Sequence, residues 1–286
     1  MSESPPLSEV VERVRTLPSA PWLLPKLIKL LGNPDAGADD VEALIRLDSA
    51  LAGGTLRLAN SAYFHSSAGC DSLTDAIVRL GFGEIYRLAT TTVASRWLAK
   101  EVSGYGWEPG DLYRHSLTVA VAADLLAKET GRANAEIAYT AGLLHDVGKL
   151  ALAFACAEHF DRVRERQRND GGAWRAAEQA VLGYDHTDIA GVLLQAWAFP
   201  ANLIEVAHFY SRPQLAAPEH RALVTHIHAA KHLAICIGTG VGEDGFQSEL
   251  DEGFLKAEGI TPDMIEALLP SVVERSAQLL RHETKT

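Results

Sequence analysis

The sequence predicts an all-α protein, a bundle of many helices. Apolar residues recur every three or four positions along most of the chain, which is the spacing of a buried helix face. No segment sustains the period-two alternation of a half-buried strand. Of the 286 residues 47% are hydrophobic and 22% are charged, which is typical of folded globular proteins and enough for one large domain or two small ones.

The N-terminal part of the chain predicts helices over residues 41–60 and 72–100. The pair of glycines at 53–54 marks either a helix break or a close contact between helices. The segment 72–100 predicts two helices that meet around residues 81–83, which read Gly-Phe-Gly. The turn-rich stretch 103–111, "SGYGWEPGD", is the best internal boundary.

The remainder of the chain also has helical periodicity, interrupted by residues that cap helices. The predicted helices cover residues 111–130, 134–160, 172–183, 185–199, 201–210, 219–238 and 261–282. The expected caps and helix starts are Ser72, Gly131, Gly183, Pro200 and Thr261.

Charge and composition exclude several classes of protein. The formal net charge is −11, with 37 acidic and 26 basic residues, which argues against a nucleic-acid-binding surface. The N-terminus lacks the apolar core of a signal peptide, and no run reaches the about 18 apolar residues of a membrane span. Cys70, Cys156 and Cys236 have no paired spacing, which indicates reduced thiols. We therefore expect a cytoplasmic protein without a membrane partner.

One stretch concentrates chemistry-bearing side chains within an apolar helix pattern. Residues 140–152, "TAGLLHDVGKLAL", contain His145 and Asp146 side by side, with Lys149 three residues further on. Neighbouring side chains diverge by about 100° on a helix, so a distortion at Gly142 or Gly148, or the reach of the imidazole, is needed to bring both to one centre. Lys149 either meets a phosphate oxygen or extends its charge from a helix end.

Further histidines lie on apolar faces of separate predicted helices. They are His115, His186 and His208. If these helices pack around the His145–Asp146 pair, the imidazoles and the carboxylate form a site suited to Zn, Fe, Mn or Ni. The alternative is a set of buried histidines that bind backbone carbonyl groups.

Five longer stretches carry a resemblance to a known family. They read "LPSAPWLLPKLIKLL", "LIRLDSALAGGTLRLANSAYF", "SLTDAIVRLGFGEIYRLA", "GLLHDVGKLAL" and "GYDHTDIAGVLLQAWAFPANLIEVAHFY". Together they resemble the HDOD family, the HD-related output domains of bacterial signalling proteins. The resemblance covers roughly residues 17–240 and implies an HD-domain-like helical bundle with an additional N-terminal helical subdomain. The implied parts are an extension 1–16, the N-terminal helical part 17–108, the HD-like core 109–240 and a C-terminal helical extension 241–286.

The resemblance also implies roles for individual residues. The implied metal ligands, for one or two divalent transition ions, are His115, His145, Asp146, His186 and His208.

The same alignment identifies departures from the catalytic relatives. Lys231 stands at the final aspartate of the HD pattern, and a charged ammonium group cannot ligate a metal. Phe209 replaces a second consecutive histidine, and Asp185 replaces the proline of the Gly-Tyr-Pro loop. His228 and His232 share one helix face and offer a substitute ligand, unless they only form a polar face.

Two functions from different classes remain open. The favoured one is a stand-alone signal-transduction module with a degenerate metal site, which binds a protein or a small, nucleotide-type ligand. The alternative is a metal-dependent phosphohydrolase acting on a nucleotide or cyclic dinucleotide, with Asp146 and Lys149 as catalytic residues. An open pocket at His145 would favour hydrolysis. A pocket filled by Trp197, Phe199 or Phe209 would favour the binding module. The oligomeric state is open.

Overall fold

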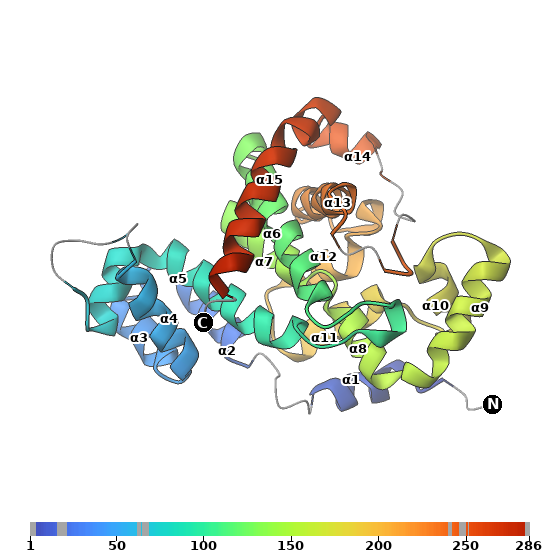
Figure 1. Ribbon diagram of the computed structural model, residues 1–286, viewed down its shortest axis with the longest axis horizontal. Coiled ribbons are helices and arrows are strands. Elements are labelled where there is room, and N and C mark those ends of the chain that lie inside the picture. The colour runs from blue at the N-terminus through green and yellow to red at the C-terminus, as the bar shows by residue number, and fades with distance from the viewer. Residues whose placement is uncertain are drawn as a thin grey trace. The chain divides into compact units, whose positions relative to one another are not determined.

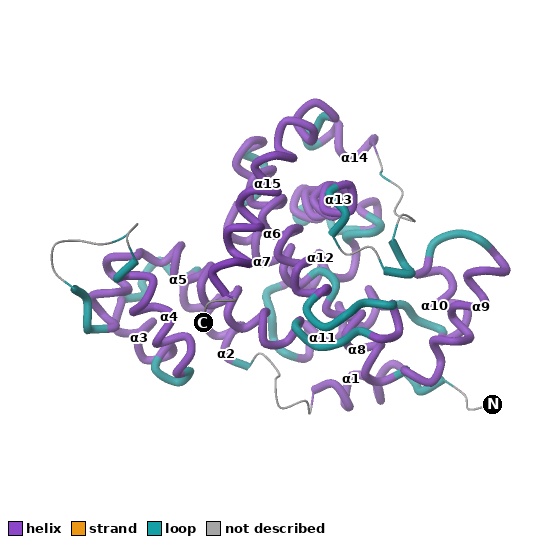
Figure 2. Tube along the Cα trace, viewed as in Figure 1, coloured by secondary structure: helices purple, strands orange, loops and turns teal. Residues whose placement is uncertain are grey.

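Helices form every regular element that the structure describes. The computed structural model describes residues 4–15, 22–61, 64, 69–239, 242–245, 250 and 252–283. Within these residues there is no strand, only an isolated β-bridge between Val102 and Trp107 (Figures 1 and 2). The predicted all-α class is confirmed. Contacts divide the chain into two compact units, residues 21–96 and residues 1–20 with 97–286. The sequence-based division at 16/17, 108/109 and 240/241 stays a prediction.

The smaller unit has its own apolar core. Its helices are α2 (Leu23–Leu31), α3 (Ala38–Ile45), α4 (Ser49–Ala59) and most of α5 (Leu73–Leu98). The break in the stretch 41–60 falls at residues 46–48, not at the glycine pair. Asp48 ends the break because its carboxylate accepts the free N–H groups of Ala50 and Leu51 at the start of α4. Gly54 lies inside α4, where its backbone approaches Leu88.

Two predicted local features of this unit are confirmed. Gly81 has a φ of 75° and interrupts the helical backbone of α5, as expected for two helices meeting there. Ser72 Oγ accepts the N–H of Asp75 and caps the first of them. A further contact follows α4, where the Asn60 amide donates to the carbonyl of Cys70 (2.7 Å) and accepts its N–H (2.8 Å).

The larger unit is built around a central buried helix. Its helices are α1 (Leu7–Arg15), α6 (Asp111–Thr130), α7 (Ala135–Leu144), α8 (Val147–Ala155), α9 (Phe160–Asp170), α10 (Trp174–Leu182), α11 (His186–Ala196), α12 (Ala201–Phe209), α13 (Arg221–Cys236), α14 (Glu252–Ala257) and α15 (Pro262–Glu283). Short 3-10 turns are η1 (Ser103–Tyr105), η2 (Ala157–His159) and η3 (Pro213–Leu215). Helix α6 is buried on nearly all sides, and α7 and α13 pack against it. Gly142 permits close packing of α7, since a Cβ there would lie 2.6 Å from the Cα of Ala120.

The helix ends mostly follow the predicted signals, with one correction. Gly131 and Gly183 end α6 and α10 in the left-handed conformation, and Pro200 precedes α12. The single helix predicted over residues 134–160 is wrong, because α7 ends at Leu144 and α8 begins at Val147. The chain bends at this point because α8 packs against α11 through Gly148.

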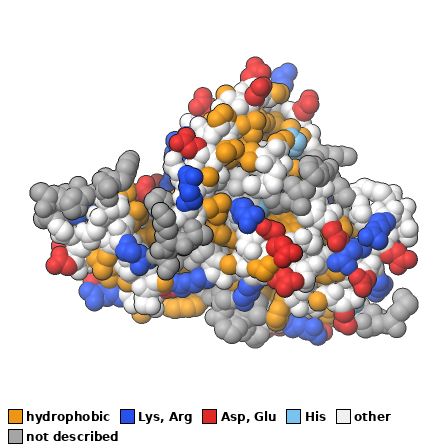
Figure 3. All heavy atoms as spheres, viewed as in Figure 1, with side chains coloured by type: hydrophobic (Ala, Val, Ile, Leu, Met, Phe, Trp, Pro, Cys, Tyr) orange, Lys and Arg blue, Asp and Glu red, His pale blue; other side chains and the backbone are white. Residues whose placement is uncertain are grey.

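The surface and the helix lengths add two observations. On the face seen in Figure 3, acidic and basic side chains are interspersed. In the part of the chain that the structure describes, no single helix is long and apolar enough to cross a membrane, although the bent pair Ala135–Ala155 and Ala157–Asp170 meets the length and composition criteria together.

Candidate metal centre

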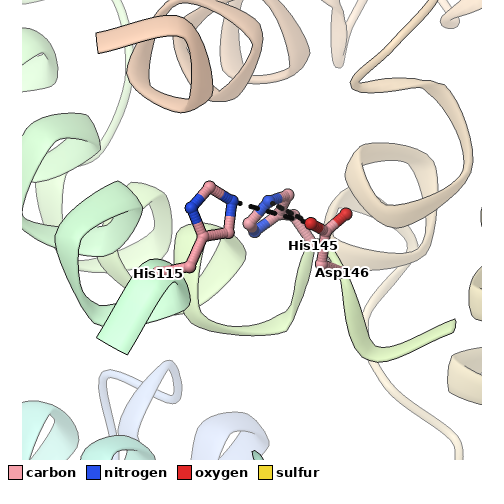
Figure 4. A group of neighbouring side chains, drawn as sticks. All are labelled: His115, His145 and Asp146. Carbon is pink, nitrogen blue, oxygen red and sulfur yellow. Dashed lines mark ion pairs between the residues drawn. The ribbon is translucent and has the colours of Figure 1, made fainter. Parts of the chain in front are cut away.

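The break between α7 and α8 brings three of the five predicted ligands together. His145 directly follows α7 as its C-cap, Asp146 directly precedes α8 as its N-cap, and His115 reaches them from α6 (Figure 4). One ligand atom from each lies within 4.8 Å of the others. All three side chains are buried, at 1% exposure or less. The distortion that joins the His-Asp pair therefore lies at residues 145–146 themselves.

The two imidazoles of this group present lone pairs to the carboxylate. Nδ1 of His145 lies 2.7 Å from the carbonyl oxygen of Gly142, and Nδ1 of His115 lies 3.1 Å from that of Thr239. Carbonyl oxygens only accept, so each Nδ1 carries the proton and each Nε2 is free to coordinate. Burial lowers the pKa of both imidazoles, which keeps them neutral near pH 7.

The donor set fits a divalent transition metal. Both Nε2 atoms are buried and have no hydrogen-bond partner among the residues that the structure describes, at 3.6 Å (His115) and 3.3 Å (His145) from Oδ2 of Asp146. Lone pairs that face a carboxylate need a cation or a proton between them. Two imidazoles and a carboxylate, with backbone carbonyls orienting the rings, suit Zn, Fe, Mn or Ni.

Two lysines contact the same carboxylate. Lys149 Nζ lies 2.6 Å from Oδ2 of Asp146, and Lys231 Nζ on α13 lies 3.3 Å from both oxygens. Burial lowers the pKa of Lys231 to about 8. Burial also opposes the charged forms of Asp146 and Lys149. Neighbouring opposite charges outweigh it, lowering the pKa of Asp146 well below its usual range and raising that of Lys149.

His186 joins the cluster indirectly, through a tyrosine. Its Nε2 lies 2.9 Å from the hydroxyl of Tyr210, which in turn donates to Oδ1 of Asp146 at 2.6 Å. Its Nδ1 lies 2.6 Å from Oε2 of the buried Glu178. Sequence reasoning missed Tyr210 and Glu178. A carboxylate within the apolar face of α10 was a signal for Glu178.

The remaining predicted residues lie outside the group of three. His208 Nε2 lies 3.2 Å from Asp188 on α11, its ring stacks on Phe209, and its side chain is 34% exposed. His228 is buried, and its Nδ1 lies 2.9 Å from the carbonyl oxygen of Tyr210. It therefore supports the chain next to the site.

Aromatic rings surround the lysines. The Nζ of Lys149 lies 4.7 Å from the ring centre of Trp107, and that of Lys231 lies 4.5 Å from the ring centre of Tyr210. Neither Trp107 nor Tyr210 is among the three rings that the sequence indicated as candidates to fill the site. Trp197, for example, packs edge-on against Trp97.

The chain matches a described family over most of its length. The model of the family described as "HDOD domain" matches residues 17–213. A curated relative from Treponema pallidum (strain Nichols), named an uncharacterized protein, is 26% identical over 77% of this chain. The match spans 42% of that relative's length.

Solved structures agree with this match. An HDOD domain protein of unknown function from Geobacter sulfurreducens has a TM-score of 0.74 at 23% identity, covering 95% of this chain and 96% of that one. A candidate signal transduction protein from Marinobacter aquaeolei VT8 has a TM-score of 0.70 at 23% identity, covering 98% and 59%. A candidate phosphohydrolase from Shewanella amazonensis SB2B has a TM-score of 0.68 at 26% identity, covering 96% and 94%. The two structures at 23% identity establish the fold alone.

Proposed function

Because the chain belongs to the HDOD family, we propose that it is a signal-transduction module that acts by binding a protein or a small ligand and not by hydrolysis. The observation that carries the proposal is the contact between Lys231 and Asp146. An ammonium group of the chain thereby occupies one side of the carboxylate that a catalytic metal would need.

Electrostatics and burial both support this function. Two unit charges about 4 Å apart interact by on the order of 4 kcal/mol at an effective permittivity of about 20, so Lys231 weakens the attraction of Asp146 for a second cation substantially. Metal-assisted hydrolysis also needs an open coordination position for water and a path for the substrate. His145 and Asp146 are fully buried and Lys149 is 1% exposed.

One observation favours the second candidate, a metal-dependent phosphohydrolase. The Nε2 atoms of His115 and His145, which have no partner within the described part of the chain, are free to coordinate. Together with Asp146 they would hold one ion, which when bound would supply a Lewis acid and a water of lowered pKa. In this candidate Lys149 would neutralise charge on a phosphate oxygen. His186 would orient Asp146 through Tyr210.

Metal content and turnover decide between the two functions. We expect the wild-type protein, purified without added metal or chelator, to contain well under one equivalent of transition metal by inductively coupled plasma mass spectrometry. It should not hydrolyse bis(p-nitrophenyl) phosphate with added Mn or Fe. Lys231→Asp should raise the metal content, and Lys256→Asp, at an exposed site on α14, is the matched control. Stoichiometric metal and turnover that His145→Ala abolishes would establish the phosphohydrolase instead.

A further inference from the structure

Residues 242–245, Gly-Glu-Asp-Gly, form an acidic loop whose carboxylate contacts Lys149. Oδ2 of Asp244 lies 2.5 Å from Lys149 Nζ, and Oδ1 accepts the indole N–H of Trp107 at 3.0 Å. One oxygen therefore faces a cation and the other a neutral donor. A protein binds a free oxyanion with the same kinds of group.

The backbone of the acidic loop fits closely against the same residues. The N–H of Glu243 donates to the carbonyl of Tyr105 at 2.9 Å. Gly242 lies directly on Trp107, since a Cβ there would be 1.8 Å from the indole nitrogen. Only glycine allows this approach, so the loop is shaped to bring Asp244 to the indole and the lysine.

The acidic loop lies closer to the surface than the charged cluster of Asp146 and Lys149. Side-chain exposure rises from 0% at Asp146 and 1% at Lys149 to 8% at Asp244 and 39% at Glu243. None of the four loop residues has a hydrophobic side chain, so ion pairs, hydrogen bonds and the contact of Gly242 with the indole hold the loop in place. Segments with few apolar contacts open at low cost in free energy.

A cavity of about 260 Å³ adjoins the loop. It is lined by Arg164, Gln167, Arg168, Trp174 and Glu243. Glu243 pairs with Arg164 at 2.6 Å, so each acidic side chain of the loop occupies one basic group of the larger unit. An anion that enters the cavity meets arginines beside the loop.

We propose that Asp244 is an internal substitute ligand, which fills an oxyanion site formed by Lys149 and Trp107 and is displaced by a small oxyanion from solution. Displacement uncovers Lys149 and the cluster beneath it. This inference deepens the proposed binding function and rests on it. It adds the chemical class of the ligand, a small phosphate or carboxylate. It also names the group that occupies the site until the ligand binds, the Asp244 carboxylate.

Hydrogen exchange of the full chain, measured by mass spectrometry, tests the displacement. The amide of Glu243 reports on the loop because it donates to the carbonyl of Tyr105 at 2.9 Å, a bond that displacement of the loop breaks. At constant ionic strength, inorganic phosphate or acetate should accelerate its exchange in the wild-type protein with a saturable dependence, while chloride has no such effect. A response to one anion alone identifies that anion's class as the ligand.

Two variants sharpen the test. Asp244→Asn removes the competing charge, so the loop should exchange at least tenfold faster without ligand. The affinity of the Asp244→Asn protein for inorganic phosphate, measured by calorimetry, should be at least tenfold higher than that of the wild type. Asp170→Asn, which breaks an exposed pair with Arg166 on α9, is the matched control and should behave like the wild type.

The proposal is overturned if neither anion changes exchange in the wild type and the Asp244→Asn loop exchanges like that of the control. Asp244 would then be a fixed structural contact. Neither readout involves metal content or turnover, so failure of this proposal is separate from failure of the proposed function.

Discussion

Replacing Gly148 by alanine tests whether the glycine of the His-Asp motif is a packing requirement. A Cβ at this position would lie 1.8 Å from the carbonyl oxygen of His186 and 2.8 Å from its carbonyl carbon. Cβ atoms essentially never approach other atoms closer than 3.0 Å, so the oxygen must move by at least 1.2 Å (3.0 − 1.8). Both clashing atoms belong to the backbone, so no side-chain rotation relieves the contact.

The expected free energy follows from two opposing effects. Alanine is more favourable than glycine inside a helix by about 1 kcal/mol. Overpacking of a buried contact costs about 1–3 kcal/mol, and a backbone clash belongs at the upper end or beyond. Movement of His186 also disturbs its hydrogen bonds to Glu178 and Tyr210. We therefore expect Gly148→Ala to lower the free energy of unfolding by ~2–3 kcal/mol.

Urea denaturation followed by circular dichroism measures this loss. Gly53→Ala on α4 is the matched control. Its Cβ would meet only the flexible end of Arg57 at 3.4 Å, so the substitution should stabilise by about 0.5–1 kcal/mol. If Gly148→Ala proved as stable as the wild type, α8 and α11 would not be packed as tightly as described.

Three further changes have defined outcomes. The hydrogen bond from Arg96 lowers the pKa of Asp48 from 3.8 to about 2, so this pair stabilises the smaller unit above pH 4 and is lost as the pH falls toward 2. Asp48→Asn keeps the helix cap and should remove ~1 kcal/mol at pH 7, a value reduced for the exposure of Arg96, and should flatten the acid limb of a stability–pH curve. Asn60→Ala should cost ~1–2 kcal/mol in urea denaturation and speed exchange of the Cys70 amide, and unchanged exchange would contradict the described contact. Tyr210→Phe should cost ~1–3 kcal/mol, because buried groups on both sides of the hydroxyl lose a partner, and equal stability would refute that role.

Most helices could be predicted because their apolar faces and caps are local signals. Helix α6 begins and ends where its periodicity and Gly131 indicate. The break at residues 145–146 could not be predicted, since α7 and α8 are both buried nearly all round and the apolar run continues across it. Its cause is the approach of α8 to His186, a contact between segments distant in sequence.

The site was predictable only where residue type carried the signal. His115, His145 and Asp146 are strong ligand types on apolar faces, and the structure brings them together. His208 has the same signal, but its helix directs it to Asp188. Asp244 lies in a stretch that reads as an acidic loop, and its contact with Lys149 depends on tertiary structure alone.

The contacts of Lys149 and Lys231 with Asp146 affect how far the stability of the larger unit depends on the concentration of free metal. A bound metal stabilises a fold in proportion to the logarithm of its free concentration, so metal-dependent folds weaken under starvation or chelation. The two ammonium groups are attached to α8 and α13 and cannot dissociate from the chain. Dilution and chelators leave their local concentration unchanged. If the proposed function holds, we expect the folding of the larger unit to be independent of metal supply, with the same melting temperature with and without EDTA.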